Sequence, residues 1–237
     1  MPPDLRTLDS SSFETLIFDH PAYEGQDLEL DGNRIVRVLE ERPTEWYWEV
    51  DWSWADVPSD PLHTLALITS LFESPEALPQ RYTLRQISQG FGLLLGPAGA
   101  DPFVCPLWNA ALPWEPRERL LHAVVPLYDR LFDVETGIEH VPFMFWDTLL
   151  GYRYHNRALA IPRSDDDARV QEVVADVISE QLLELNGPWS APSGLHGAHH
   201  AHHANGYRAV ERWLGDPDND DAHWTKYARQ VLRGEVM

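Results

Sequence analysis

The sequence predicts an all-α protein of stacked antiparallel helix pairs, in a HEAT-like or α-solenoid-like arrangement, and three observations lead to this prediction. From residue 60 onward, apolar side chains recur every three or four positions in segments of about 10–20 residues, the spacing of amphipathic helices. Short loops rich in proline, glycine or aspartate separate these segments, as in folds of packed helix pairs. The 237 residues are 43% hydrophobic, enough for one core, and we expect a single helical domain over residues 1–237.

The N-terminal region carries one predicted helix and the only strong strand signal of the chain. Ser10–Ser12 can cap this helix, because serine side chains accept hydrogen bonds from the backbone N–H groups of the first turn, and apolar residues with helical spacing follow. The triplet Asp-His-Pro at 19–21 ends the helix. Residues 28–39 hold an Asp-Gly turn signal between two apolar stretches, which predicts a small β-hairpin.

The next two helices are predicted from their N-terminal residues and their apolar stripes. Asp60 is placed to cap the first of them, with Pro61 at the first helical position, where the missing N–H removes no hydrogen bond. The second occupies residues 82–96. Its internal glycines, Gly90 and Gly92, each cost about 1 kcal/mol of helix stability relative to alanine, so we expect them to permit close helix packing.

The remainder of the chain continues as helices. A long one is predicted over residues 113–134, and Pro126 should kink or split it because proline cannot donate to the carbonyl four residues earlier. Residues 140–150 form a short, very apolar helix. Residues 165–185 form the clearest helix of the chain, with Ser164 as its cap and acidic residues in its first turn. Helical patterns also cover three later segments, at 193–203, 205–214 and 222–235.

The charge balance excludes several classes of partner. The chain has 38 acidic and 18 basic residues, a net charge of −20, so its surface repels nucleic-acid phosphates and anionic lipid. No apolar run of about 18 residues predicts a membrane span. The same charge would speed the encounter with a basic protein, and a protein partner of that kind is the expected one. From charge alone the favoured interpretation is that the acidic balance only keeps a tryptophan-rich protein soluble, since many acidic proteins bind nothing basic. Cys105 is the only cysteine and no secretory signal pattern is present, so a cytoplasmic location is predicted.

Four tryptophans crowd into one short segment, as Trp46, Trp48, Trp52 and Trp54. Their alternating spacing does not match a helix. One interpretation is an irregular segment that covers the edge of the helical core, and it is favoured because several exposed tryptophans without a partner promote aggregation. The other interpretation is an exposed surface that anchors a partner protein.

The stretch SGLHGAHHAHH at 193–203 contains five histidines. On a helix, His196, either His199 or His200, and His203 would share one face, and an H-x-x-x-H pair can reach one metal ion such as zinc. The glutamate of the zinc-protease motif is missing, so a further ligand would have to come from elsewhere in the chain. The candidates for that ligand are Asp147, His155, Glu180 and His223.

A second interpretation of the same histidines needs no metal. His196 and His200 would form hydrogen bonds to neighbouring helices in the core, while His199 and His202 would lie on the solvated side of the helix. This interpretation is favoured, because matches to motifs this short are often coincidental. No cofactor is therefore expected, and zinc or another divalent metal is the alternative.

Asp147 follows Trp146 in the apolar stretch FMFWD. Aromatic neighbours would partly desolvate this carboxyl group and raise its pKa, which would suit acid/base chemistry. Alternatively, Asp147 accepts a hydrogen bond from one of the motif histidines. The sequence contains no nucleophile elbow, phosphate-binding loop, dinucleotide fingerprint or Cys-x-x-Cys pair, and we therefore assign no catalytic residue.

Taken in order, several of these stretches resemble the motifs of a family of uncharacterised bacterial proteins built of stacked α-helices. The matching text is FDHP at 18–21, EWYW at 45–48, LITSLFESPEAL at 67–78, YTLRQISQGFGLLL at 82–95, FMFWD at 143–147 (similar to YMWWD) and SGLHGAHH at 193–200 (similar to SALHGLGH). Order and spacing agree from residue 16 to residue 214. The chain departs from the family pattern at His199, where the family has glycine, and in the insertion-like stretch 22–44.

This resemblance implies a HEAT-like helical scaffold without an established activity, so no catalytic role can be carried over. It marks four positions as motif residues, namely His196, His200, Trp146 and Asp147. The small residues around the two histidines in that motif suggest tight helix packing.

Together these observations favour a non-enzymatic acidic scaffold that binds another protein. Its most concrete form is an immunity protein that neutralises a basic toxin by complementary charge. The first alternative is a metal-dependent hydrolase that uses His196 and His200. The second is a structural subunit of a larger assembly, which would expose a large apolar patch near residues 46–54.

Overall fold

The computed structural model describes residues 2–20, 30–31, 34–35, 47, 50–96, 98–135, 137–138, 141–154, 162 and 164–236. Within these residues the fold is all-α, as predicted, with one very small pair of strands. The described helices are α1 (Ser10–Phe18), α2 (Pro61–Glu73), α3 (Leu78–Arg81), α4 (Leu84–Leu95), α5 (Trp114–His122), α6 (Val124–Leu127), α7 (Val141–Tyr154), α8 (Asp165–Glu184), α9 (Ser190–Ala201), α10 (Ala204–Gly215) and α11 (Ala222–Arg233). None of them is both long enough and apolar enough to cross a lipid bilayer.

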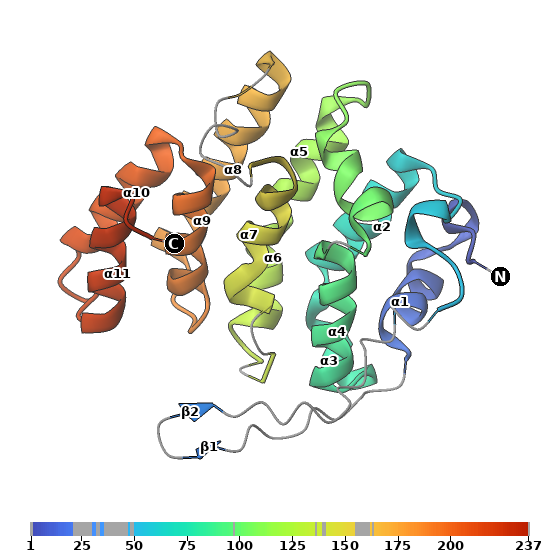
Figure 1. Ribbon diagram of the computed structural model, residues 1–237, viewed down its shortest axis with the longest axis horizontal. Helices are drawn as coiled ribbons and strands as arrows, with labels where there is room; N and C mark the ends of the chain where they lie inside the picture. The colour runs from blue at the N-terminus through green and yellow to red at the C-terminus, as the bar shows by residue number, and fades with distance from the viewer. Residues whose placement is uncertain are drawn as a thin grey trace.

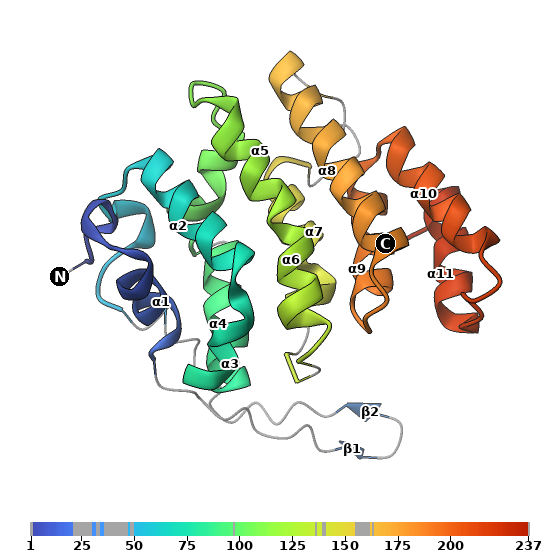
Figure 2. The ribbon, with the colours of Figure 1, turned by 180° about the vertical axis from the view of Figure 1, so that it is seen from behind.

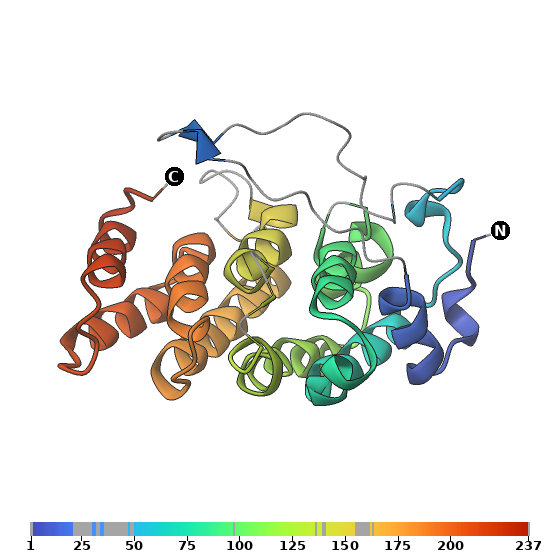
Figure 3. The same cartoon turned by 90° about the horizontal axis from the view of Figure 1, so that it is seen from below.

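The helices alternate between two layers along the long axis of the molecule (Figures 1 and 3). One layer contains α1, α4, α7, α9 and α11, the other contains α2, α5, α8 and α10, and neighbours within each layer are in contact. Figure 2 shows the same stack from behind. The prediction of packed helix pairs is thus confirmed. A regular HEAT-like repeat is not confirmed, because the helices vary in length from 4 to 20 residues.

The two strands lie where the hairpin is predicted. β1 (Leu30–Asp31) pairs with β2 (Arg34–Ile35) in antiparallel orientation, with Leu30 opposite Ile35. Each strand is only two residues long, far shorter than a typical strand. The rest of residues 28–39 lies outside the described part of the chain.

Two of the three predicted caps form as expected, at Asp60 and Ser164. The cap of α1 was predicted wrongly, because Asp9 and not one of Ser10–Ser12 precedes the helix, and its side chain accepts a hydrogen bond from the Ser12 backbone N–H. The Asp60 side chain accepts hydrogen bonds from the backbone N–H groups of Leu62 and His63 at the start of α2, and the Ser164 hydroxyl accepts one from Asp167 at the start of α8. Each such cap satisfies N–H groups that have no partner within the helix itself.

Pro126 splits the long helix predicted over residues 113–134. Helix α5 ends at His122, and α6 begins at Val124. The break falls where the ring of Pro126 removes the N–H that would have paired with the His122 carbonyl. A turn of π-helix at Tyr128–Phe132 then continues the chain.

Gly90 permits the close approach of α1 to α4. A Cβ atom at this position would lie 2.3 Å from Phe18 Cδ1 and 2.9 Å from the backbone oxygen of Ile17. Gly92 is different, because among the described residues a Cβ there would meet only the Tyr47 hydroxyl, at 3.4 Å. The expectation of close packing therefore holds for Gly90, and Gly92 is not needed for it.

Candidate functional site

The candidate site lies between α7, α9 and α11, and a glycine sets the distance between the first two. A Cβ on Gly197 of α9 would lie 2.5 Å from Trp146 Cδ1 on α7. The Trp146 indole is fully buried and donates its Nε1–H to Gln181 Oε1 at 2.8 Å. The tight packing implied by the small residues of this motif is thus present, and Trp146 belongs to the core rather than to the histidine cluster.

The start of α9 is fixed by a residue that the sequence did not single out. Asp133 Oδ1 accepts hydrogen bonds from the backbone N–H groups of Trp189 at 2.8 Å and Ser190 at 3.0 Å, and its second oxygen accepts one from the Ser190 hydroxyl. Burial raises the pKa of Asp133, and these hydrogen bonds oppose that shift. Gly187 makes room for the carboxyl group, since a Cβ there would lie 1.9 Å from Asp133 Cγ.

His196 is held on three sides. The residue is 7% exposed, and its ring stacks on Phe143 of α7, with centroids 4.5 Å apart and planes 23° apart. Its Nδ1 lies 2.7 Å from the Tyr227 hydroxyl of α11. Its Nε2 lies 3.2 Å from Nε2 of His200, one turn later on α9. The orientation of this imidazole is therefore fixed by residues from three helices.

Burial shifts the pKa values of both His196 and Tyr227. It lowers the pKa of His196 to about 3, and the neighbouring His200 and His199 add to that effect. Burial also raises the pKa of the Tyr227 phenol to about 12. At neutral pH the phenol is therefore protonated and the imidazole is uncharged, so only one of the two ring nitrogens of His196 carries a proton.

Asp147 and His200 form the more open side of the cluster. Asp147 lies one turn after Phe143 on α7, and its Oδ1 is 3.3 Å from His200 Nε2. The Asp147 and His200 side chains are 29% and 24% exposed. One donor atom from each of Asp147, His196 and His200 lies within 4.8 Å of the others. The structure thus brings together three of the four motif residues.

His203 does not join this group, which corrects the expectation that it shares a face with His196. Helix α9 ends at Ala201, because His202 adopts the left-handed conformation with φ of 48°. His203 then caps α10 by accepting a hydrogen bond from Asn205 N–H at 3.3 Å. The helical spacing that links residues 196 and 203 in the sequence is interrupted by this turn.

The other two histidines are also placed differently from the expectation. His199 is buried rather than solvated, and its ring lies 5.1 Å from that of His200. His202 is half-buried, with its Nδ1 3.1 Å from the Tyr207 hydroxyl. Of the further ligands considered, Asp147 is in the group, Glu180 and His223 are not, and His155 lies outside the described residues.

The tryptophan segment is only partly described. Trp54 is buried, packs against Phe103 with ring centroids 5.8 Å apart and donates its Nε1–H to the Tyr47 carbonyl at 3.2 Å. Trp52 is half-buried against Trp54, with ring centroids 4.7 Å apart. These two therefore cover the core and are not an exposed anchor. Trp46 and Trp48 lie outside the described residues.

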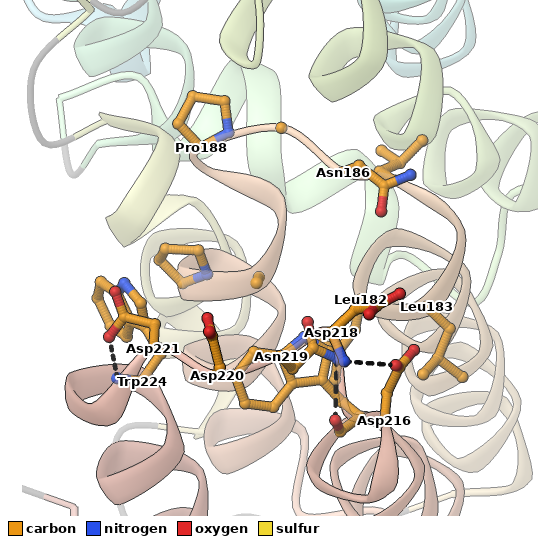
Figure 4. A pocket seen from close by; sticks show the side chains of 15 residues that line it. Leu182, Leu183, Asn186, Pro188, Asp216, Asp218, Asn219, Asp220, Asp221 and Trp224 are labelled. Carbon is orange, nitrogen blue, oxygen red and sulfur yellow. Dashed lines mark hydrogen bonds between the residues drawn. The ribbon is translucent and has the colours of Figure 1, made fainter.

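A pocket of about 460 Å³ lies at the C-terminal end of the stack, between α8, the start of α9 and the loop from α10 to α11 (Figure 4). Its lining includes Asp216, Asp218, Asp220 and Asp221, and no lysine, arginine or histidine. The sequence marks this loop only as a short acidic connection. The structure adds an apolar side, formed by leucine and proline residues of α8 and α9 and by Trp213 and Trp224.

Comparison with known proteins adds no assignment: no family model matches the chain, and no curated protein or solved structure is significantly similar to it. The family resemblance drawn from the motifs stays a prediction.

Proposed function

We propose that this protein is a non-enzymatic acidic scaffold that binds a basic protein, and that the pocket at the α10–α11 loop receives a cationic side chain of that partner. The observation that carries the proposal is the lining of this pocket, which combines four aspartates with no basic residue. The pocket has a volume of about 460 Å³, within the range of sites that enclose a ligand-sized group.

The carboxylates of the pocket differ in how far they are already engaged. Asp221 caps α11 through hydrogen bonds from the backbone N–H groups of His223 and Trp224, and Asp216 accepts one from Asp218 N–H. The side chains of Asp218 and Asp220 are exposed at the rim. These two are the carboxylates best placed to meet a guanidinium or ammonium group.

The apolar lining of the pocket fits the aliphatic part of an arginine or lysine side chain. Arginine and lysine carry apolar stems that pack on apolar surface while the charged head reaches polar groups. Trp224, which is half-buried in the lining, adds an aromatic ring of the kind that attracts cations, whereas Trp213 is buried. A pocket with carboxylates at the rim and an apolar wall therefore complements a long cationic side chain better than a neutral or anionic one.

The charge of the whole chain supports a more specific form of the same proposal. A net charge of −20 accelerates association with a basic protein over distances longer than direct contacts. A toxin that acts on a polyanion exposes a cationic surface, and an acidic scaffold can cover it. We therefore propose toxin neutralisation as the biological form of this binding.

The test measures binding of a fluorescent arginine-rich peptide by anisotropy at low and at physiological salt. The variant Asp218→Asn/Asp220→Asn should weaken binding about 2- to 30-fold, since exposed charge pairs contribute about 0.2–1 kcal/mol each. The control Glu172→Gln/Glu211→Gln also removes two negative charges, but at exposed positions outside the pocket. It should change the dissociation constant of the peptide less than 2-fold. Equal losses in both variants, or no binding at low salt, would refute the proposal.

A further inference from the structure

We propose that Asp147, His196 and His200 form a binding site for one divalent transition-metal ion, for which Zn²⁺ is the best match. This inference is independent of the acidic pocket, since none of the three residues lines it. It concerns a different ligand, a metal ion, and is tested by separate measurements.

The spacing of the donor atoms fits an ion placed between them. Zinc binds histidine nitrogen at about 2.0–2.1 Å and carboxylate oxygen at about 2.0–2.2 Å in tetrahedral geometry, so two ligand atoms on one ion lie about 3.3–3.4 Å apart. His200 Nε2 lies 3.2 Å from His196 Nε2 and 3.3 Å from Asp147 Oδ1. These two distances match the expected separation, and the third pair, a His196 nitrogen and an Asp147 oxygen, lies within 4.8 Å.

The pairing of the two histidines supports the same conclusion. Their Nε2 atoms face each other at 3.2 Å, so in the absence of an ion one nitrogen must carry the proton that the other accepts. A metal ion replaces that proton and is bound by both lone pairs. The two rings stand nearly perpendicular, with an interplanar angle of 78° and centroids 4.6 Å apart, so the close approach of the nitrogens does not come from stacking of the rings.

His196 is also oriented by contacts outside the ligand set. Its second ring nitrogen, Nδ1, lies 2.7 Å from the Tyr227 hydroxyl, and the ring stacks on Phe143. With an ion on Nε2, the neutral ring would carry its proton on Nδ1, and Nδ1–H would donate to the Tyr227 oxygen. A hydrogen-bond partner on the ring nitrogen that does not bind the metal holds the ring orientation and raises metal affinity by about 10- to 100-fold.

The ligand types select the class of metal. Two imidazoles and one carboxylate suit zinc and neighbouring transition metals, whereas magnesium and calcium prefer sites made of oxygen ligands alone. Three protein ligands leave one tetrahedral position, and Asp147 and His200 are each about a quarter exposed. A water molecule can therefore complete the coordination from the solvent side.

The experiment uses the untagged full-length chain after chelator treatment, titrated calorimetrically with Zn²⁺ and separately with Mg²⁺. We expect one Zn²⁺ per chain, no Mg²⁺ binding, a higher melting temperature with zinc, and a Co²⁺ derivative with the visible absorption of a four-coordinate site. Absence of stoichiometric zinc binding at micromolar concentrations would overturn the proposal.

Three variants separate this site from adventitious binding to a histidine-rich surface. His200→Gln and Asp147→Asn should each weaken zinc binding at least 10-fold, and both residues are exposed enough for the variants to fold. Tyr227→Phe keeps all three ligands and should weaken binding about 10-fold through the lost hydrogen bond to His196.

The matched control is His223→Gln, which removes an exposed histidine of α11 outside the ligand group. Zinc affinity and stoichiometry should be unchanged in this variant. Equal losses in His223→Gln and His200→Gln, or unchanged affinity in His200→Gln, would show that the ion binds elsewhere. Circular dichroism of each variant without metal checks that the fold is retained.

Discussion

Replacement of Gly197 by alanine tests whether the approach of α9 to α7 sets the geometry of the candidate site. The new Cβ would lie 2.5 Å from Cδ1 and 2.7 Å from Cγ of the Trp146 indole, and 3.1 Å from Ile178 Cδ1. The indole cannot move aside easily, because it is fully buried and hydrogen-bonded to Gln181. The extra methyl group must therefore push the two helices apart or distort the tryptophan.

The change in the free energy of unfolding caused by Gly197→Ala is the sum of two opposing effects. Alanine favours the helix over glycine by about 1 kcal/mol, and overpacking of a dense core costs about 1–3 kcal/mol. A contact of 2.5 Å with a rigid ring places the cost near the upper end, about 3 kcal/mol. The net loss of unfolding free energy is then about 2 kcal/mol, which lowers the melting temperature by about 4–8 °C for a chain of this length.

The assay is thermal unfolding followed by circular dichroism, with Gly215→Ala as the control. Gly215 is the last residue of α10, and a Cβ there would meet nothing within 4 Å. Its replacement should leave the melting temperature unchanged or raise it by up to about 4 °C. A Gly197→Ala protein that melts at or above the wild-type temperature would show that our account of the helix contact is wrong.

Three other predictions concern the supporting structure. Arg117→Ala should lower the free energy of unfolding by about 2–3 kcal/mol in urea titrations, because Arg117 is buried, donates to the Leu107 carbonyl and pairs with both oxygens of a partly exposed Asp166. Arg117 also lowers the pKa of Asp166. The pair therefore stabilises the fold above the unfolded pKa of about 3.9, and this contribution is lost as the pH falls through the lower folded pKa. In Arg117→Met, the free energy of unfolding should therefore fall less steeply as the pH is lowered through this range. Tyr128→Phe should cost about 1–3 kcal/mol in the same titrations, because it leaves the Pro142 carbonyl and the Ser193 hydroxyl without the buried phenol that bonds both.

Local signals in the sequence were sufficient for most helix boundaries. The caps at Asp60 and Ser164 and the break at Pro126 depend on backbone hydrogen bonds within a few residues, and all three are found as predicted. The end of α9 at Ala201 was not predicted, because the sequence analysis continued this helix to His203. It depends on His202 entering the left-handed region, which a non-glycine residue does rarely and without a clear sequence signal.

The candidate site was less accessible to sequence reasoning, because its parts come from three helices. The spacing of His196 and His200 on one face was visible, and Asp147 was among several candidate partners. Tyr227 was missed because it lies 31 residues from His196 and becomes its neighbour only when α11 packs on α9. The available signal was the apolar stripe of α11, which identifies a face to be buried but not the helix that covers it.

The placement of the two sites bears on the alternative of a metal-dependent hydrolase. Trp224 lines the acidic pocket and also lies 6.2 Å, between ring centroids, from the Phe143 ring that stacks on His196. Aromatic side chains therefore lie between the pocket and the ligand group, and a molecule bound in the pocket would not contact an ion at His200. A hydrolase would have to admit its substrate from the exposed side of Asp147 and His200 instead. Helix α11 supplies Tyr227 to one site and Trp224 to the other. If binding at one site changes the affinity of the other through this helix, thermodynamic linkage requires the reverse effect to be of the same size.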